Sequence, residues 1–236
     1  MISAACEWGL AGIAALRDRV SVFVIVDVLS FSTAVDVALA RGAVIYPVPD
    51  EDTAEAGRTA SRLGAMLAQK RRVAAPGQFS LSPASLLGVP PGLKLVLPSP
   101  NGARLSLAGG DRPVLAGCLR NAAAVARAAR DLAGTGMVAV IPAGERWPGG
   151  SLRPAIEDLL GAGAILHHLD RPCSPEAQIA RDAYRSAGTE LAALIRGSVS
   201  GRELIERGFP RDVELATAEE VSGQAPLLIE GAYRAG

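Results

Sequence analysis

Polar side chains gather where apolar segments of this chain pass into helix-forming segments, the place at which α/β sheets usually bind ligands. Asp27 lies near the end of the apolar, β-branched run 20–28, and Ser30, Ser32 and Thr33 follow it closely. An acidic group at the carboxyl end of a strand suits a hard cation, whereas hydroxyls and free N–H groups at a helix start suit an anion. The plainer alternative is that the three hydroxyls only cap the helix.

Further polar groups have similar positions along the chain. Asn101 follows Ser99-Pro100 in a strong turn signal, and the stretch 118–121 begins another predicted helix, where the helix dipole favours a bound anion or a thiolate. Gly144-Glu145-Arg146 lies in a long loop, and Glu157-Asp158 begins a helix rich in small residues. Each group is a weak signal when taken alone.

Residue spacing argues against several familiar sites. The chain has no P-loop and no complete dinucleotide fingerprint. Leu29 stands where haloacid-dehalogenase-like phosphatases have a second aspartate, and Ala124 stands where a cysteine phosphatase would need an arginine after Cys118. His167 and His168 are adjacent on a predicted helix and point about 100° apart, so they do not chelate one metal ion. We interpret the histidine pair as structural.

The elements that must position these groups alternate as in an α/β domain. The pattern of strand, polar turn, helix, glycine and strand occurs at 26–48 and again at 114–141, which predicts an internal duplication of a β-turn-α-β unit. We expect strands at 20–28, 43–48, 94–97, 114–116, 137–141 and 227–230, helices at about 30–41, 53–67, 122–132 and 155–169, further helices within 171–207 and after 210, and loops at 75–92 and 142–154.

The charges of the chain balance, with 24 Lys plus Arg against 24 Asp plus Glu. A nucleic-acid-binding protein usually has a basic surplus, so we expect no nucleic-acid partner. All the cations except Lys70 and Lys94 are arginines, and they are spread over the whole length. An arginine is therefore a candidate only where its local context singles it out.

The composition predicts a cytoplasmic protein. Hydrophobic residues make up 49% of the chain, yet no apolar run reaches about 18 residues without a charge or a breaker, so we expect no membrane partner. The N-terminus lacks a basic region before its apolar stretch, and the 3 cysteines show no CxxC spacing. The length suits a single domain, 1–236, which contains two similar subdomains at about 1–95 and 96–236 if the duplication holds.

Five motifs together resemble those of the 2-phosphosulfolactate phosphatases, the ComB proteins of coenzyme M biosynthesis. In order, they are V-D-V-L-S-F-S-T at 26–33, S-P-N-G at 99–102, G-C-L-R-N-A at 117–122, I-P-A-G-E-R at 141–146 and E-D-L-L-G-A-G-A-I at 157–165. The resemblance implies a three-layer α/β/α fold with a mixed sheet and an internal duplication. It also implies a magnesium-dependent hydrolase that removes phosphate from (2R)-2-phospho-3-sulfolactate.

The chemistry implied by this resemblance needs a metal ion and a base. A bound Mg²⁺ neutralises charge that builds on the phosphoryl oxygens and orients a water molecule. Because Mg²⁺ keeps several water ligands, a few carboxylates are enough to hold it. The candidates are Asp27, Glu145, Glu157 and Asp158, one of which is the general base instead. Cys118 is a candidate nucleophile, although a small packing residue is the plainer interpretation.

The implied substrate carries a phosphate, a carboxylate and a sulfonate, so its recognition needs cations and hydrogen-bond donors. Local context singles out Arg120 and Arg146 as bidentate clamps for these groups. The other candidate substrate-binding residues are Ser32, Thr33, Asn101 and Asn121. Many members of the family have Arg at the place of Ser30, so we expect a cation that contacts phosphate or sulfonate to be missing there.

The sequence leaves three questions open. The substrate is phosphosulfolactate or another phosphorylated hydroxy acid, and the third reading is a non-catalytic anion-binding protein of the same fold. Attack by water and a covalent intermediate are both compatible with the candidate residues. A homodimer is only the common default for a cytosolic enzyme.

Overall fold

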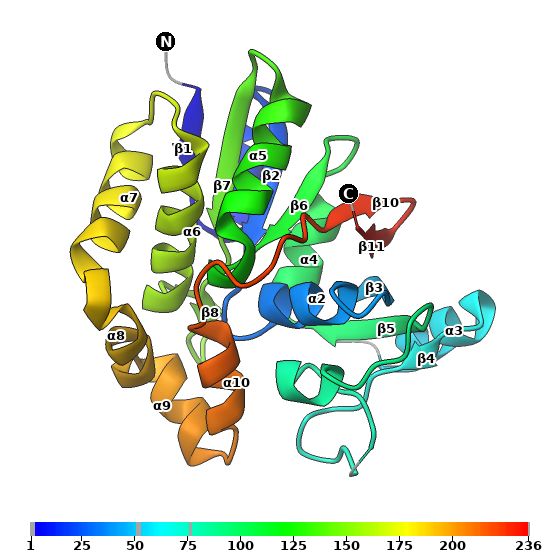
Figure 1. The fold of residues 1–236 in the computed structure, drawn as a ribbon. Helices are drawn as coiled ribbons and strands as arrows, with labels where there is room; N and C mark the ends of the chain where they lie inside the picture. The colour runs from blue at the N-terminus through cyan, green and yellow to red at the C-terminus, as the bar shows by residue number, and fades with distance from the viewer. Residues whose placement is uncertain (1–2, 51–52, 76, 236) are drawn as a thin grey trace.

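The fold is known from a computed structural model that describes residues 3–50, 53–75 and 77–235. It has a mixed nine-stranded sheet flanked by helices (Figure 1), which confirms the expected α/β class. The strand order is β1-β7-β2-β6-β10-β11-β3-β5-β4, and β8 and β9 form a separate hairpin. The strands are β1 (Ala4–Cys6), β2 (Val20–Val26), β3 (Val44–Pro49), β4 (Met66–Leu67), β5 (Lys94–Ser99), β6 (Val114–Gly117), β7 (Met137–Pro142), β8 (Glu145–Arg146), β9 (Leu152–Arg153), β10 (Leu227–Ile229) and β11 (Ala232–Arg234).

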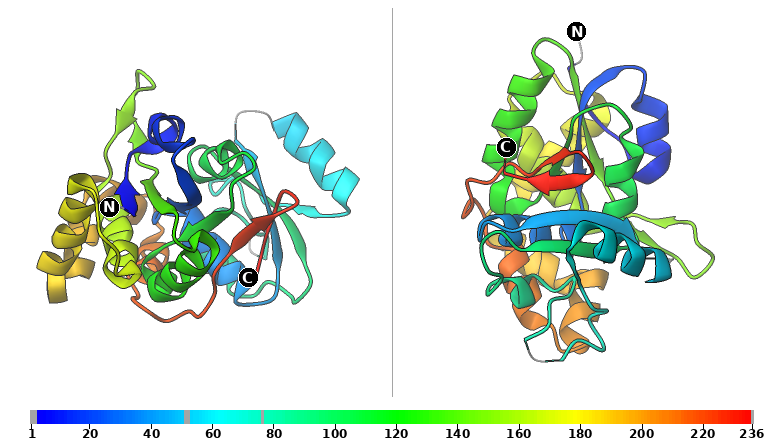
Figure 2. Two further views of the ribbon diagram at one scale, coloured as in Figure 1. Left: turned by 90° about the horizontal axis from the view of Figure 1, so that it is seen from above. Right: turned by 90° about the vertical axis from the view of Figure 1, so that its right-hand side faces the viewer.

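The sheet consists of two parallel groups of strands that the C-terminal hairpin joins. One group contains β1, β7, β2 and β6, and the other contains β3, β5 and β4. Hairpin β10–β11 lies between the groups and is antiparallel to β6 on one side and to β3 on the other. Figure 2 shows this red hairpin between the two groups. Hairpin β10–β11 therefore makes the sheet continuous.

Helices lie on both faces of the sheet and beyond one of its edges. The α-helices are α1 (Gly9–Leu16), α2 (Phe31–Leu39), α3 (Thr53–Leu63), α4 (Gly102–Ala108), α5 (Ala122–Ala133), α6 (Ile156–Leu169), α7 (Pro175–Ala187), α8 (Leu191–Gly197), α9 (Val199–Glu206) and α10 (Pro210–Ala216). Short 3-10 turns occur at Pro83–Leu86, Leu119–Asn121 and Gly188–Glu190. Among the described residues, no helix is long and apolar enough to cross a membrane.

Strand β2 shows why the first group of strands is covered on both faces. Successive side chains of a strand point to opposite faces, and every residue of β2 except Ser21 is apolar. Val24 and Val26 pack in the cluster that contains residues of α5 and α6, whereas Phe23 and Ile25 pack in the cluster that contains residues of α1 and α4. The continuous apolar run therefore produces a strand buried between two helical layers.

The second group of strands is sandwiched in the same way by α2 and α3. Ile45 and Leu95 pack with residues of α2, including Phe31. Val96, which points to the opposite face, packs with Ala56 of α3. The N-terminal end of α2 is thereby fixed against a strand group that lies across the C-terminal hairpin from β2.

The two predicted β-turn-α-β units have different places in the sheet. Strand β2, helix α2 and strand β3 connect the two parallel groups, whereas β6, α5 and β7 remain in one group, with β6 and β7 on either side of β2. The structure therefore does not show the expected duplication. Both units were predicted from similar local sequence patterns, but the pairing of their strands depends on distant parts of the chain.

Several short elements differ from the sequence expectation. The stretch 98–102 predicted only a turn, yet helix α4 begins at Gly102, and the expected loop 142–154 contains hairpin β8–β9. The predicted strand 227–230 is one arm of a hairpin. The expected loop 75–92 includes residue 76, which lies outside the described residues, and it contains a short 3-10 turn. These elements are too short for their hydrophobic periodicity to be recognised.

Candidate active site

A pocket of about 220 Å³ lies at the carboxyl ends of the parallel strands. Asp27 follows β2, Asn101 follows β5 and Glu145 begins β8 shortly after β7, and all three line this pocket. Residues of α9 form another part of the wall, and α9 lies below the strand ends in Figure 1. The fold therefore brings together three of the sequence-predicted site residues from distant segments.

Asp27 is held at the pocket by backbone groups. The side chain is 7% exposed, Oδ1 accepts a hydrogen bond from the Phe31 N–H at 3.2 Å, and Oδ2 accepts one from the Gly102 N–H at 2.9 Å. A Cβ at residue 102 would lie 2.3 Å from the Phe31 ring, so glycine permits this close approach. Burial raises the pKa of Asp27 to about 6, opposed by these two hydrogen bonds, and the negative charge of Glu157 raises it further.

Glu145 is the second carboxylate of the pocket. Its Oε2 accepts a hydrogen bond from Asn101 Nδ2 at 3.0 Å. Burial raises the pKa of Glu145 to about 7, and the charges of Asp27 and Glu157 contribute in the same direction. Glu145 therefore changes its protonation state near neutral pH, as a group that moves a proton must.

The two acidic residues at the start of α6 have different surroundings. Asp158 ties two loops together, because its Oδ1 accepts from the Val28 N–H at 2.7 Å and its Oδ2 accepts from the Gly144 N–H at 2.9 Å. Burial and the charges of Asp27 and Glu157 raise the pKa of Asp158. Glu157 is 2% exposed, and its Oε2 is buried without a hydrogen-bond partner in the described part of the chain.

The donor set of this region fits a hard divalent cation. Three neighbouring carboxylates, those of Asp27, Glu145 and Glu157, influence one another electrostatically, and one buried oxygen of Glu157 has no donor. Within the ranges that the structure describes, no group of three His, Cys, Asp or Glu side chains is placed so that it could hold a metal ion. Mg²⁺ keeps several water ligands and is often held by only one or two carboxylates, so the oxygen donors of this region are of the type that suits it.

The hydroxyls of Ser32 and Thr33 brace the turn that carries Asp27. Ser32 Oγ accepts from the Asp27 N–H at 3.1 Å and donates to the Ile25 carbonyl at 3.1 Å. Thr33 Oγ1 donates to the Val28 carbonyl at 2.8 Å. Both side chains are fully buried and neither lines the pocket, so the structure places them in the framework of the site.

The structure does not bring Cys118, Arg120 and Asn121 to the pocket. Cys118 and Asn121 are fully buried, and Asn121 Oδ1 accepts from the Cys118 N–H at 2.8 Å. Burial raises the pKa of the Cys118 thiol, which disfavours the thiolate. Arg120 Nε instead donates to Asp36 Oδ2 at 2.8 Å. This stretch begins a helix, as the sequence predicted, but its polar groups have partners inside the protein.

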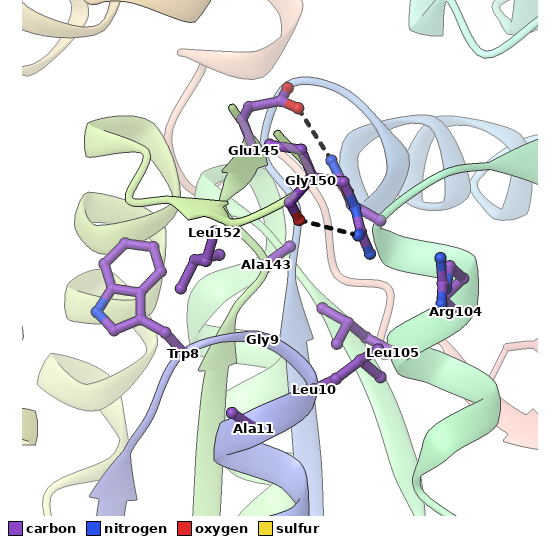
Figure 3. Close-up of a pocket in the computed structure, with 12 residues that line it drawn as sticks. Trp8, Gly9, Leu10, Ala11, Arg104, Leu105, Ala143, Glu145, Gly150 and Leu152 are labelled. Carbon is purple, nitrogen blue, oxygen red and sulfur yellow. Dashed lines mark hydrogen bonds between the residues drawn. The ribbon is translucent and has the colours of Figure 1, made fainter. Parts of the chain in front are cut away.

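Arg146 lines a second pocket, of about 200 Å³, that shares lining residues with the first. Figure 3 shows this second pocket, with Glu145, Trp8 and Arg104 among its labelled residues. Asn101 and Glu145 line both pockets, and Trp8 and Arg104 line only the second. Arg146 Nη1 donates to the Gly150 carbonyl at 3.4 Å. The structure therefore places Arg146 near Glu145 but not in the pocket of Asp27.

Arg71 lines the pocket of Asp27, although no sequence motif singled it out. Its Nη2 donates to Ser30 Oγ at 2.7 Å, so a guanidinium lies beside Ser30, where we expected a cation to be missing. Arg71 lies just before a long loop and next to Arg72, and nothing local distinguishes the two. The contact joins residues 41 positions apart, which only the folded chain reveals.

Known proteins match most of this chain. The family model described as 2-phosphosulpholactate phosphatase matches residues 13–231, which include all five motifs. The 2-phosphosulfolactate phosphatase of Methanothermobacter thermautotrophicus is 34% identical over 209 residues, or 88% of this chain and 87% of the relative. The probable 2-phosphosulfolactate phosphatase of Pseudothermotoga lettingae is 28% identical over 215 residues, or 90% of this chain and 91% of that protein. The chain therefore belongs to the 2-phosphosulfolactate phosphatase family.

Proposed function

We propose that this protein is a Mg²⁺-dependent phosphatase that hydrolyses (2R)-2-phospho-3-sulfolactate to 3-sulfolactate and inorganic phosphate. The observation that carries the proposal is the pair of carboxylates, Asp27 and Glu145, that faces one pocket in a chain of this family. Both groups have a raised pKa because burial disfavours their charge. A cluster of this kind is typical of sites that bind a cation or move a proton.

Asp27 and Glu157 are the residues we propose to hold the metal ion. The fixed orientation of Asp27 suits a ligand, because each of its oxygens already accepts one backbone N–H and retains a lone pair. Glu157 offers a buried oxygen without a donor in the described structure. When bound, Mg²⁺ neutralises charge on the phosphoryl oxygens and orients the attacking water.

Glu145 is the general base of the proposed reaction. It accepts one proton from the attacking water, whose oxygen forms the new bond to phosphorus as the phosphorus–ester oxygen bond breaks. The ester oxygen leaves with the bonding pair, takes a proton from solvent and becomes the 2-hydroxyl group, and Glu145 then returns its proton to solvent. A pKa of about 7 suits this role at neutral pH, and the Asn101 hydrogen bond orients the carboxylate.

Asp158, Ser32 and Thr33 act as positioning residues in this proposal. Asp158 joins the loop after β2 to the loop after β7, which sets the separation between Asp27 and Glu145. Ser32 and Thr33 fix the turn between β2 and α2. None of these side chains needs to touch the substrate.

The direct test is phosphate release from 2-phosphosulfolactate by the wild-type protein, with Mg²⁺ and after removal of divalent ions by EDTA. We expect release that requires Mg²⁺ and stops with EDTA. Undiminished activity in a thoroughly metal-stripped sample would remove the metal from the proposal. Binding of 3-sulfolactate without turnover of any phosphate ester would instead identify a non-catalytic binding protein, and faster turnover of a sulfonate-free phosphorylated hydroxy acid would identify a different substrate.

A further inference from the structure

We propose that Arg71, assisted by Arg207, forms a subsite for a second acidic group of the substrate, a carboxylate or sulfonate separate from the ester phosphate. The inference rests on the proposed phosphatase function and names the part of the site that selects doubly acidic phosphate esters.

Arg71 and Arg207 line the same pocket of about 220 Å³ as Asp27 and Glu145. Glu203 also lines it, with its Oε2 3.6 Å from Arg207 Nη2, so Arg71 is the main cation of this side of the pocket and Arg207 assists it. The Arg71 side chain is 18% exposed, and burial lowers its pKa, as does the nearby positive charge of Arg207. Two guanidinium groups that repel each other in one pocket are stabilised when an anion lies between them.

The Arg71 guanidinium is held in place before any ligand binds. Nη2 donates to Ser30 Oγ at 2.7 Å and to the Leu81 carbonyl at 3.2 Å, and it lies 3.3 Å from Asp212 Oδ2. The guanidinium carbon also lies 5.1 Å from the centre of the Phe209 ring. A side chain fixed in this way loses little conformational entropy when it binds an anion.

The contacts of Arg71 leave donors for a ligand. Its polar contacts with the described residues all involve Nη2, so Nη1 has no partner there, and Nε is buried without one. A guanidinium has five N–H donors in a rigid fork that matches carboxylate and sulfonate oxygens. The Nη1 donors are therefore the ones we assign to the substrate.

Asp212 is a positioning residue for this subsite. It is 1% exposed and does not line the pocket, and its Oδ1 accepts from Ser82 Oγ at 2.5 Å and from the Ala84 N–H at 3.2 Å. Its other oxygen faces Arg71. Asp212 thus joins α10 to the loop that follows β4 and fixes the guanidinium at the pocket edge.

The two sides of the pocket bind different groups of a doubly acidic substrate in this proposal. The carboxylate wall, Asp27 and Glu145, binds the metal ion and with it the phosphate. The arginine wall, Arg71 and Arg207, binds the second anion. Inorganic phosphate needs only the first wall, so its binding is expected to be independent of Arg71. 3-Sulfolactate carries the second acidic groups without the phosphate, so its binding reports on the arginine wall alone.

The test compares Arg71→Met with Arg72→Met, a matched control at the exposed neighbouring arginine. Calorimetry measures binding of 3-sulfolactate and of inorganic phosphate, and unfolding curves verify that both variants are folded. We expect Arg71→Met to weaken 3-sulfolactate binding at least about tenfold, as for a lost charge-assisted hydrogen bond, and phosphate binding less than about threefold. Arg72→Met should change neither, and Arg71→Lys should lie between wild type and Arg71→Met, because it keeps the charge and loses the fork.

Kinetics then distinguish the two anions. A KM that rises in Arg71→Met for both 2-phosphosulfolactate and 2-phospholactate assigns the carboxylate to Arg71, and a rise for 2-phosphosulfolactate alone assigns the sulfonate. Unchanged 3-sulfolactate binding in folded Arg71→Met, or no binding of it by the wild type, overturns the subsite. A wild type that binds 3-sulfolactate through Arg71 but hydrolyses no phosphate ester overturns the phosphatase proposal and leaves the subsite in place.

Discussion

Asp27 and Asp36 are two buried aspartates on either side of the start of α2, and their charges are handled in opposite ways. Asp36 is fully buried, and its oxygens meet Arg120 Nε at 2.8 Å and Ser222 Oγ at 2.5 Å. Asp27 accepts two backbone N–H groups and has another carboxylate, Glu157, nearby. Burial raises the pKa of both aspartates, but only Asp36 has a paired cation, so only Asp36 is neutralised within the protein.

The difference shows that a buried charge with a structural role has its partner inside the protein, whereas a buried charge with a functional role faces a pocket. The Asp36 cluster joins α2 to the segment after α10, because Arg120 also donates to the Leu215 carbonyl and Ser222 belongs to that segment. Its groups satisfy one another, and none of them lines the pocket of Asp27. The Asp27 cluster leaves negative charge facing a pocket, which is useful only if a ligand supplies the missing positive charge.

The largest expected effect is on stability and comes from removing the cation of the Asp36 cluster. Arg120→Met leaves Asp36 buried without its cation, and removing one partner of a buried pair costs about 3–5 kcal/mol. Urea unfolding should show this loss, and Arg127→Met, at an exposed arginine of α5, should change the free energy of unfolding by less than about 0.5 kcal/mol. A loss below about 1 kcal/mol for Arg120→Met would show that Asp36 does not need the pair.

A substitution in the Asp27 cluster should instead lower the catalytic activity. Asp27→Asn removes the charge that we assign to the metal site, so kcat/KM for 2-phosphosulfolactate should fall at least about 100-fold, or about 2.7 kcal/mol of transition-state stabilisation. The control is Asp18→Asn, at an exposed aspartate outside the five motifs. If Asp27→Asn loses less than about threefold, the catalytic site lies elsewhere.

The sequence predicted the parts of the fold that local patterns determine. Strands β2 and β7 are strongly apolar and helices α5 and α6 are long, and all four occur close to where we expected them. Helices α1 and α4 are too short for their periodicity to be read, and the strand order depends on pairing between distant segments, which a single sequence does not encode visibly.

The candidate site was predictable to the same extent. Asp27, Asn101 and Glu145 were found because each follows a strand or a strong turn, and the carboxyl ends of parallel strands meet at one edge. Arg120 was also chosen from its place at a helix start, but its role depends on Asp36, 84 positions away. Arg71 was missed for the same reason, since its contact with Ser30 exists only after folding.

A smaller effect is the pH dependence of stability that Glu145, the second carboxylate of the Asp27 pocket, should cause. The folded-state pKa of Glu145, about 7, lies above its ordinary value of 4.5, so the folded protein holds this proton more tightly than the unfolded chain does. The contribution of Glu145 to stability is therefore fully present below about pH 4.5 and is lost as the pH rises through 7. Above pH 7 the buried charge destabilises the metal-free protein.

Glu145→Gln tests this sign, because glutamine is neutral at every pH and its side-chain oxygen still accepts from Asn101. In EDTA, the variant and wild type should have similar free energies of unfolding near pH 4.5, and the variant should be more stable by about 1–2 kcal/mol at pH 8, a value reduced for partial exposure. Equal stabilities at both pH values would show that Glu145 is not destabilised by its surroundings. Added Mg²⁺ should reduce the difference at pH 8, since it supplies the missing positive charge.

The smallest expected effect on activity comes from substituting Cys118, which belongs to the Asp36 cluster and not to the Asp27 pocket. This thiol is fully buried, its pKa is raised by burial, and its Sγ donates to Asn121 Oδ1 at 3.4 Å. A nucleophilic cysteine needs a thiolate and access to substrate. Cys118 has neither, because it is buried beside Asp36 and Arg120. Cys118→Ala should therefore keep kcat/KM within about threefold of wild type. A 100-fold loss in a folded variant, or rapid reaction of the native thiol with iodoacetamide followed by inactivation, would move the chemistry from the carboxylate pocket to the start of α5 and reverse the assignment of the two regions.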